Sequence, residues 1–188
     1  MPRANLSPAK IVDEALRWVD AHGYEPLSMA GLAETLGVAA PSLYKHVASL
    51  GWLQRGVALH ALRDLREVLQ QAAAGRRQED ALDHLARAYR AFAKDYPGRY
   101  AAIQRAPDAR DPDWHALTEG VLGPIYDMLD TYGRTGYAAT HDVRLLRSAL
   151  HGFVLLEAQR GFGLPLDTDE SFNHVLTALD RTFRRAPP

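Results

Sequence analysis

A short run of hydroxyl, aromatic and basic side chains lies between two apolar segments near the start of the chain. Within "APSLYKHV", Ser42, Tyr44, Lys45 and His46 lie close together in sequence. Lysine pairs with phosphate, serine and tyrosine hydroxyls donate to phosphate oxygens, and histidine can contact either a phosphate or a base edge. These residue types therefore suit a surface that binds the phosphate backbone of a nucleic acid.

The charge of this stretch differs from the charge of the whole chain. The 188 residues have a formal net charge of -1, so composition gives no argument for nucleic acid. No Asp or Glu lies between Val38 and Arg55, and Lys45 and Arg55 give the stretch a local charge of +2. Because local sign matters more than the total at a docking face, the stretch remains a candidate DNA-binding surface.

Helix signals on both sides of the stretch predict a helix-turn-helix. Ser28 can cap a short helix that ends at Gly37, and a second short helix starts near Ala40 and ends near Val47. Gly37 suits the left-handed conformation that such a turn requires. Leu43 and Val47 are then expected to face the core, while the polar side chains face outward.

The remaining segments also show helical periodicity, and none indicates a strand. A Ser-Pro pair at residues 7–8 starts the first helix, and Ser49 caps a long helix that ends near Gly75. The next helix carries the stripe from Leu82 to Tyr96, and the Pro-Gly dipeptide at 97–98 is expected to end it. The sequence therefore predicts an all-α protein of about nine helices.

Two domains are expected. A helix-turn-helix DNA-binding domain covers residues 1–48, and a larger helical domain for effector binding and dimerisation covers residues 49–188. The helix over 49–74 connects the two.

The stretch "LSMAGLAETLGVAAPSLYKHVASLGWL" resembles the N-terminal domain of the tetracycline-repressor (TetR/AcrR) family of bacterial transcription regulators. The resemblance rests on the Ser28 cap, the Leu-Ala pair, the Gly-Val turn and the run from Leu43 to Val47. A lysine commonly follows the cap of the fourth helix in this family, and here Leu50 stands in its place.

A second resemblance is to the WHG-type C-terminal domain of a subset of these regulators. It rests on His151-Gly152, Phe153, Glu157, Gly161-Phe162 and an acidic residue followed by Ser-Phe within 169–172. Leu150 replaces the tryptophan of the motif.

The resemblance implies a ligand-responsive, DNA-binding transcriptional regulator. In its usual mode, such a protein is a repressor released from a palindromic operator when a small apolar or aromatic effector binds. The implied partners are double-stranded DNA, a second copy of the chain and the effector. The predicted DNA-binding residues are Ser28, Met29, Ala39, Ala40, Pro41, Ser42, Tyr44, Lys45 and His46.

Two further sets of residues are assigned to the helical domain. The expected effector pocket comprises Tyr89, Phe92, Tyr96, Tyr100, Trp114, Leu117, Val121, Phe153 and Glu157, although aromatic stripes at helical spacing are also typical of a core. Gly120, Gly123 and Gly152 would leave space between helices. The expected dimer interface comprises Leu146, Leu150, Val154, Phe172, Val175, Leu176, Leu179 and Phe183.

Two other function classes stay open. One is a helical protein-interaction adaptor with a degenerate helix-turn-helix, and the other is a hydrolase or metalloenzyme. The eight histidines show no His-x3-His or Glu-x-x-His spacing, and there is no cysteine, nucleophile elbow or phosphate loop. The chain is therefore expected not to be an enzyme and to have no catalytic residue, metal or cofactor.

The sequence contains no signal for secretion or membrane insertion. The N-terminus lacks an apolar h-region, and no apolar run approaches the roughly 20 residues that a membrane span needs. The absence of cysteine fits a reducing compartment. A cytoplasmic location without a membrane partner is expected.

Overall fold

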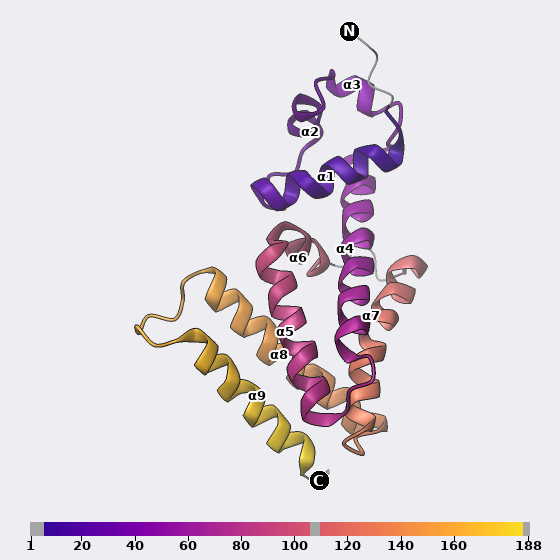
Figure 1. Cartoon of the computed structure of the whole chain (residues 1–188). Coiled ribbons are helices and arrows are strands. Elements are labelled where there is room, and N and C mark those ends of the chain that lie inside the picture. The colour runs from indigo at the N-terminus through magenta and orange to yellow at the C-terminus, as the bar shows by residue number, and fades with distance from the viewer. Residues whose placement is uncertain (1–5, 106–109, 186–188) are drawn as a thin grey trace. The chain divides into compact units, whose positions relative to one another are not determined.

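The structure, a computed structural model, describes residues 6–105 and 110–185, and these ranges form nine α-helices and no strand (Figure 1). The helices are α1 Pro8–His22, α2 Met29–Thr35, α3 Ala40–Leu43, α4 Leu50–Ala73, α5 Gln78–Asp95, α6 Pro97–Ile103, α7 Pro112–Asp130, α8 Gly136–Ala158 and α9 Thr168–Arg184. The prediction of an all-α protein is confirmed.

Serine side chains begin three of the first four helices, as expected from sequence. The Ser7 hydroxyl accepts from the backbone N–H of Lys10, and the Ser28 hydroxyl accepts from that of Gly31 at 3.2 Å. Ser49 does the same for the first turn of α4, with 3.0 Å between its hydroxyl and the Trp52 nitrogen. Each bond satisfies a backbone donor that has no partner within the helix.

The structure differs from the sequence prediction at two short helices. The helix α3 ends at Leu43, and residues 44–46 form turns rather than further helix. The helix α6 begins at Pro97, the residue that was expected only to end the helix before it. Proline suits the first position of a helix because the N–H that it lacks would have no helical partner.

The chain forms two compact units, described here separately. The first comprises residues 1–64 and 95–117, and the second comprises residues 65–94 and 118–188. The first unit is larger than the predicted domain of residues 1–48, because it includes the first part of α4 and all of α6.

The core of the first unit is formed by the inward faces of its helices. Its fully buried side chains come from α1, α2, the α3 region, α4 and α6, and include Ile11, Ala15, Val19, Leu32, Leu43, Leu53, Val57 and Ala102. Val47 is 2 % exposed. The prediction that Leu43 and Val47 face the core is therefore confirmed, and Gly37 has the expected positive φ of 65°.

The helix α6 packs directly on α1. A Cβ atom at Gly98 would overlap the backbone carbonyl of Val19, so only glycine fits. Next to it, the Arg99 guanidinium pairs with Asp20 of α1 at 2.7 Å and with Asp64 of α4 at 2.9 Å. Backbone contact and paired charges thus attach α6 to α1 and α4.

The second unit has an apolar core and a buried ion pair. Phe172 and Phe183 of α9 are fully buried, and Leu82 and Leu85 of α5 are nearly so. Arg134, at the turn before α8, pairs with Asp142 at 2.5 Å and also donates to the carbonyl of Arg185 at 3.1 Å. The arginine thereby joins the start of α8 to the end of α9.

Replacing Gly98 with alanine should destabilise the protein. The new methyl group would force α6 away from α1, and overpacking of this kind costs about 2 kcal/mol of unfolding free energy. Urea denaturation followed by circular dichroism measures the loss. The matched control is Gly123→Ala in α7, where a Cβ meets no atom within 4 Å, so its stability should stay unchanged or rise slightly. Equal stabilities of the two variants would contradict the close packing.

Candidate functional site

The residues after α2 present a polar surface on a buried scaffold. Tyr44 is 54 % exposed, Lys45 and Pro41 are also exposed, and Ser42 and His46 are partly exposed. Leu43 and Val47 lie between them in sequence and anchor the segment in the core. We call Pro41, Ser42, Tyr44, Lys45 and His46 the outward face.

Four further residues were predicted to bind DNA. Ala39 is exposed, and Ala40 and Ser28 are partly exposed. Met29, however, is 6 % exposed and packs within the core of the first unit. The prediction for Met29 is therefore wrong: the first residue of α2 faces inward, because its spacing of three and four residues from Leu32 and Ala33 places it on the same buried side of the helix.

Arg55 does not add free positive charge near the outward face. Its guanidinium bonds Asp111 at 2.5 and 2.8 Å and Asp113 at 2.6 Å. The hydrogen bond from Arg55 lowers the pKa of the Asp111 carboxyl, so the pair remains charged at neutral pH. The local charge of +2 that the sequence suggested is thus reduced to that of Lys45.

The first turn of α4 carries an aromatic residue that the sequence reading missed. Trp52 is 38 % exposed, whereas Leu50 is partly buried. The indole N–H of Trp52 can donate to a phosphate oxygen. Tryptophan is usually buried, so the sequence alone offered no signal that this one would be exposed.

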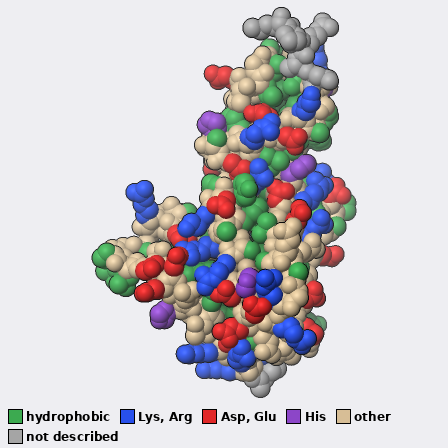
Figure 2. Space-filling model, in the orientation of Figure 1, with side chains coloured by type: hydrophobic (Ala, Val, Ile, Leu, Met, Phe, Trp, Pro, Cys, Tyr) green, Lys and Arg blue, Asp and Glu red, His purple; other side chains and the backbone are tan. Residues whose placement is uncertain are grey.

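Surface charge is mixed on the face shown in Figure 2. Basic and acidic side chains are interspersed there without a broad patch of one sign. Among the helices of residues 6–105 and 110–185, none is long and apolar enough to cross a bilayer.

Comparison with known proteins decides the family. The family model "Bacterial regulatory proteins, tetR family" matches residues 11–49, and the model "Tetracyclin repressor-like, C-terminal domain" matches residues 82–179. The chain belongs to the TetR family. Its outward face is accordingly the helix-turn-helix surface of a TetR-family transcriptional regulator, and the family suggested by sequence is confirmed.

Relatives agree with this assignment. An uncharacterized HTH-type transcriptional regulator of Mycobacterium tuberculosis, Rv0681, is 40% identical over 94% of this chain and 81% of its own length. The HTH-type regulator YobS of Bacillus subtilis is 32% identical over 97% of this chain and 93% of its own length. In fold, the chain resembles the Streptomyces coelicolor TetR family protein ActR in complex with actinorhodin, with a TM-score of 0.66, 21% identity and coverage of 96% and 97%.

The residues predicted to line an effector pocket are divided between the two units of this TetR-family chain. Tyr96, Tyr100, Trp114 and Leu117 belong to the first unit, and Tyr89, Phe92, Val121, Phe153 and Glu157 belong to the second. Phe92, Tyr100, Leu117 and Phe153 are at most 7 % exposed. None of the nine lines either of the two hollows described below.

Glu157 is engaged by arginine. The Arg90 guanidinium bonds both carboxylate oxygens of Glu157, at 2.5 and 2.8 Å, and pairs with Asp169 of α9 at 2.7 Å. Arg90 also lies over the rings of Phe153 and Phe172, at 5.4 and 4.7 Å from their centroids. Glu157 is therefore part of a structural cluster that joins α5, α8 and α9.

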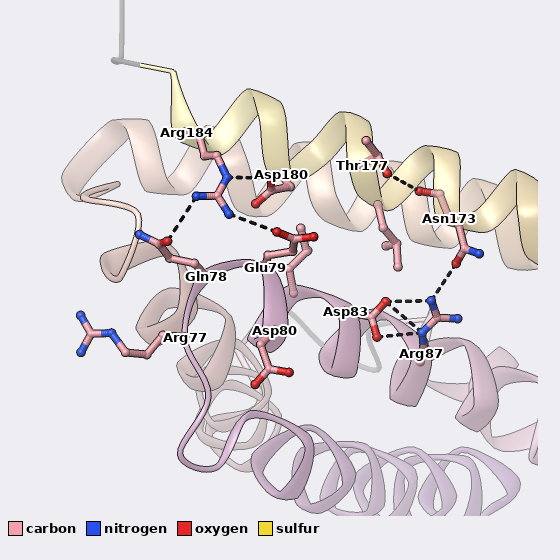
Figure 3. Close-up of a pocket in the computed structure, with 12 residues that line it drawn as sticks. Arg77, Gln78, Glu79, Asp80, Asp83, Arg87, Asn173, Thr177, Asp180 and Arg184 are labelled. Carbon is pink, nitrogen blue, oxygen red and sulfur yellow. Dashed lines mark hydrogen bonds and ion pairs between the residues drawn. The ribbon is translucent and has the colours of Figure 1, made fainter.

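A groove of about 700 Å³ separates α5 from α9 (Figure 3). Its charged side chains are largely paired with one another. Arg87 bonds Asp83 and Asn173, and Arg184 bonds Asp180 and Glu79. With these groups satisfied, the groove offers few unused donors or acceptors to a ligand.

A second hollow, the α4–α7 crevice, has a volume of about 630 Å³. Its walls are mostly small side chains from the end of α4, the start of α5 and the middle of α7. It is lined by Gln70, Ala73, Ala74, Gly75, Arg76, Arg77, Ala81, Gly120, Gly123, Pro124, Asp127, Met128 and Thr131. Two of the three glycines that the sequence suggested would leave space, Gly120 and Gly123, do line a hollow.

The residues predicted for the dimer interface require correction. Seven of the eight are at most 6 % exposed within their own chain: Leu146, Leu150, Val154, Phe172, Leu176, Leu179 and Phe183. They face the core because the most strongly apolar side of each helix packs inside the unit. Only Val175 is partly exposed.

A different apolar face of α8 remains exposed. Leu145 and Leu156 are 43 % and 46 % exposed, and Ala149 and Gly152 are partly exposed between them. Their spacing of four, three and four residues places them on one side of the helix. We call these four residues the α8 stripe.

The Arg90–Glu157 pair should make stability depend on pH. Arg90 lowers the pKa of Glu157 below its ordinary value of 4.5. Stabilisation is therefore complete above that value and is lost as pH falls through the lower, folded-state pKa. Urea midpoints between pH 7 and pH 3 should fall less steeply for Glu157→Gln than for the native chain.

The partner substitution gives a larger effect at neutral pH. Arg90→Met leaves the Glu157 carboxylate, whose side chain is 15% exposed, with only the longer contact to Lys94 at 3.6 Å, and should cost about 3 kcal/mol. The exposed pair of Arg17 and Glu14 is the control, since its loss should cost less than about 1 kcal/mol. A native pH profile in Glu157→Gln would exclude this role for the carboxyl.

Proposed function

We propose that this TetR-family regulator is a repressor that binds a palindromic operator as a homodimer and leaves it when a small apolar effector binds. The observation that carries the proposal is the outward face: Tyr44 and Lys45 are exposed while Leu43 and Val47 hold the segment in the core. This arrangement presents phosphate-binding groups on a rigid support. Binding, rather than catalysis, is therefore the inferred activity, and DNA as partner implies the cytoplasm.

Effector binding is proposed from the family and from its relatives. ActR, which shares this fold, was solved in complex with actinorhodin. In the present chain, α6 packs on α1 through Gly98 and Arg99, so an effector that displaces α6 would also displace α1. Because the outward face shares a core with α1, such a shift would alter how the face meets DNA.

Homodimerisation is proposed through the α8 stripe. Leu145 and Leu156 are large apolar side chains that the chain itself does not cover. On α9, Val175 is partly exposed and Ala178 is exposed, which extends the apolar surface. A two-fold dimer would place two outward faces at successive turns of the same DNA groove, which suits a palindrome.

Lys45→Ala should weaken binding to operator DNA. The DNA is found by footprinting the region upstream of the protein's own gene, and affinity is then measured by fluorescence anisotropy between 50 and 200 mM salt. Loss of one phosphate contact per subunit should reduce affinity about tenfold and lower the salt slope by about 1 for each subunit. Tyr44→Ala should also weaken binding.

Arg55→Met is the matched control for Lys45→Ala. Since Arg55 is bonded to Asp111 and Asp113, its removal should leave the salt slope unchanged even if stability falls. A salt slope that drops for Arg55→Met and not for Lys45→Ala would refute the assignment of the outward face. Failure of every variant, including the native chain, to bind any upstream DNA would favour the protein-adaptor alternative.

Leu145→Glu should convert the dimer into a monomer. The side chain is 43 % exposed, so the charge should not disturb the core, but it would be buried without a partner in the proposed interface. Sedimentation velocity measures the change. Leu164→Glu, in the α8–α9 connection at 73 % exposure, is the control that should remain dimeric. A dimeric Leu145→Glu variant would move the interface elsewhere.

A further inference from the structure

The α4–α7 crevice is an open volume lined mostly by small side chains. It is lined by Ala73 of α4, Ala74 just after that helix, and Gly120 and Gly123 of α7. A Cβ at Gly123 would meet no atom within 4 Å, so space remains beside the helix there. A volume of about 630 Å³ is within the range of about 300–1,000 Å³ found for small-molecule sites.

An arginine borders this crevice without a partner. A Cβ at Gly120 would lie 2.6 Å from Cδ of Arg66, so the Arg66 side chain lies across Gly120, a lining residue. The Nε atom of Arg66 is buried and has no hydrogen-bond partner. Within residues 6–105 and 110–185, no carboxylate pairs with its guanidinium.

The lack of a carboxylate partner distinguishes Arg66 from the other arginines described above. The other buried or partly buried arginines described above, Arg90, Arg99 and Arg134, each bond a carboxylate. A buried donor without an acceptor costs about 1–3 kcal/mol, more when the donor is charged. An acceptor supplied by a ligand would remove that cost. The Thr118 hydroxyl, two residues before Gly120 on α7, is also buried without a hydrogen-bond partner in the described part of the chain.

The charge around the crevice also favours an anion. Arg76 and Arg77 line it together with a single acidic residue, Asp127, and Arg66 borders it. Arg76 pairs with Asp80 at 3.7 Å and donates to the carbonyls of Ala72 and Ala74. Three arginines thus stand against the two carboxylates of Asp127 and Asp80, so a ligand with a negative group would be electrostatically favoured.

We propose that the α4–α7 crevice binds a small apolar carboxylic acid. Its carboxylate would accept from Arg66, and its apolar body would lie beside Gly123 against Ala73 and Pro124. The inference rests on the proposed function, because it gives the effector of the regulator a site and a chemical class. Guanidinium is suited to carboxylate because its N–H groups match the two oxygens.

The first test uses 2-naphthoate and its uncharged counterpart 2-naphthalenemethanol as probes. Isothermal titration of the full-length protein should show saturable binding of 2-naphthoate. Arg66→Met, which keeps the length of the side chain and removes its charge, should weaken 2-naphthoate binding about tenfold or more. Binding of the alcohol should change less than about threefold, since it makes no charged bond.

The matched control is Arg63→Met, which removes an exposed arginine one turn earlier on the same helix. It should leave the affinity for 2-naphthoate unchanged. If Arg63→Met and Arg66→Met weaken binding equally, general attraction between charges is responsible and the proposal fails. Absence of 2-naphthoate binding to the native protein, or equal binding to Arg66→Met, also overturns it.

A second variant tests the volume rather than the charge. Gly123→Leu fills the open space beside α7 and should abolish binding of both probes, while Gly123→Ala should retain most of it. Thermal unfolding establishes that both variants fold. If Gly123→Leu is folded and still binds the acid with native affinity, the site lies elsewhere.

Operator binding separates this proposal from the proposed function. Each variant is also titrated with the footprinted DNA in the absence of a probe, and all are expected to bind like the native protein. A native chain that binds DNA but not 2-naphthoate would refute the carboxylate site and leave the regulator intact. A chain that binds 2-naphthoate through Arg66 but binds no DNA would refute the regulator and leave the site.

Discussion

The contact of α6 with α1 is the constraint on which the first unit depends. At Gly98, the backbone of α6 lies so close to the Val19 carbonyl that no side chain fits between them. Arg99 then joins Asp20 and Asp64, so one residue pairs with both α1 and α4. A helix far along the sequence thus becomes part of the same core as the helix-turn-helix. The outward face and α6 therefore share one core.

Paired arginines organise the second unit in a similar way. Arg90 holds the end of α8 and the start of α9 through Glu157 and Asp169, and it packs against two phenylalanine rings. Arg134 joins the start of α8 to the end of α9. Arg90 and Arg134 both bond carboxylates within the unit. Arg66 has no carboxylate partner among the described residues, and its side chain lies beside the α4–α7 crevice, which is lined mostly by small residues.

The proposed DNA-binding surface carries little charge. Arg55 is neutralised by Asp111 and Asp113, which leaves Lys45 as the basic residue of the outward face. With few phosphate contacts per subunit, specific binding would need two faces acting together, so dimerisation matters more here than in a strongly basic repressor. The resemblance to the family leads to the expectation of a basic residue at position 50, which is Leu50 here. The exposed Trp52 lies two residues further along, in the first turn of α4.

The sequence by itself determined the helices other than α6 and the end of α3, the turn at Gly37 and the inward direction of Leu43 and Val47, because capping and periodicity are local properties. Only the tertiary structure decided which apolar side of α8 is covered, that Met29 is buried and that Arg55 is paired. Each of these depends on a partner from another helix: the Asp111 that binds Arg55 is 56 residues away in sequence. The spacing of residues along a helix predicts which side chains share one side of that helix. The neighbouring helices determine which of its sides is buried.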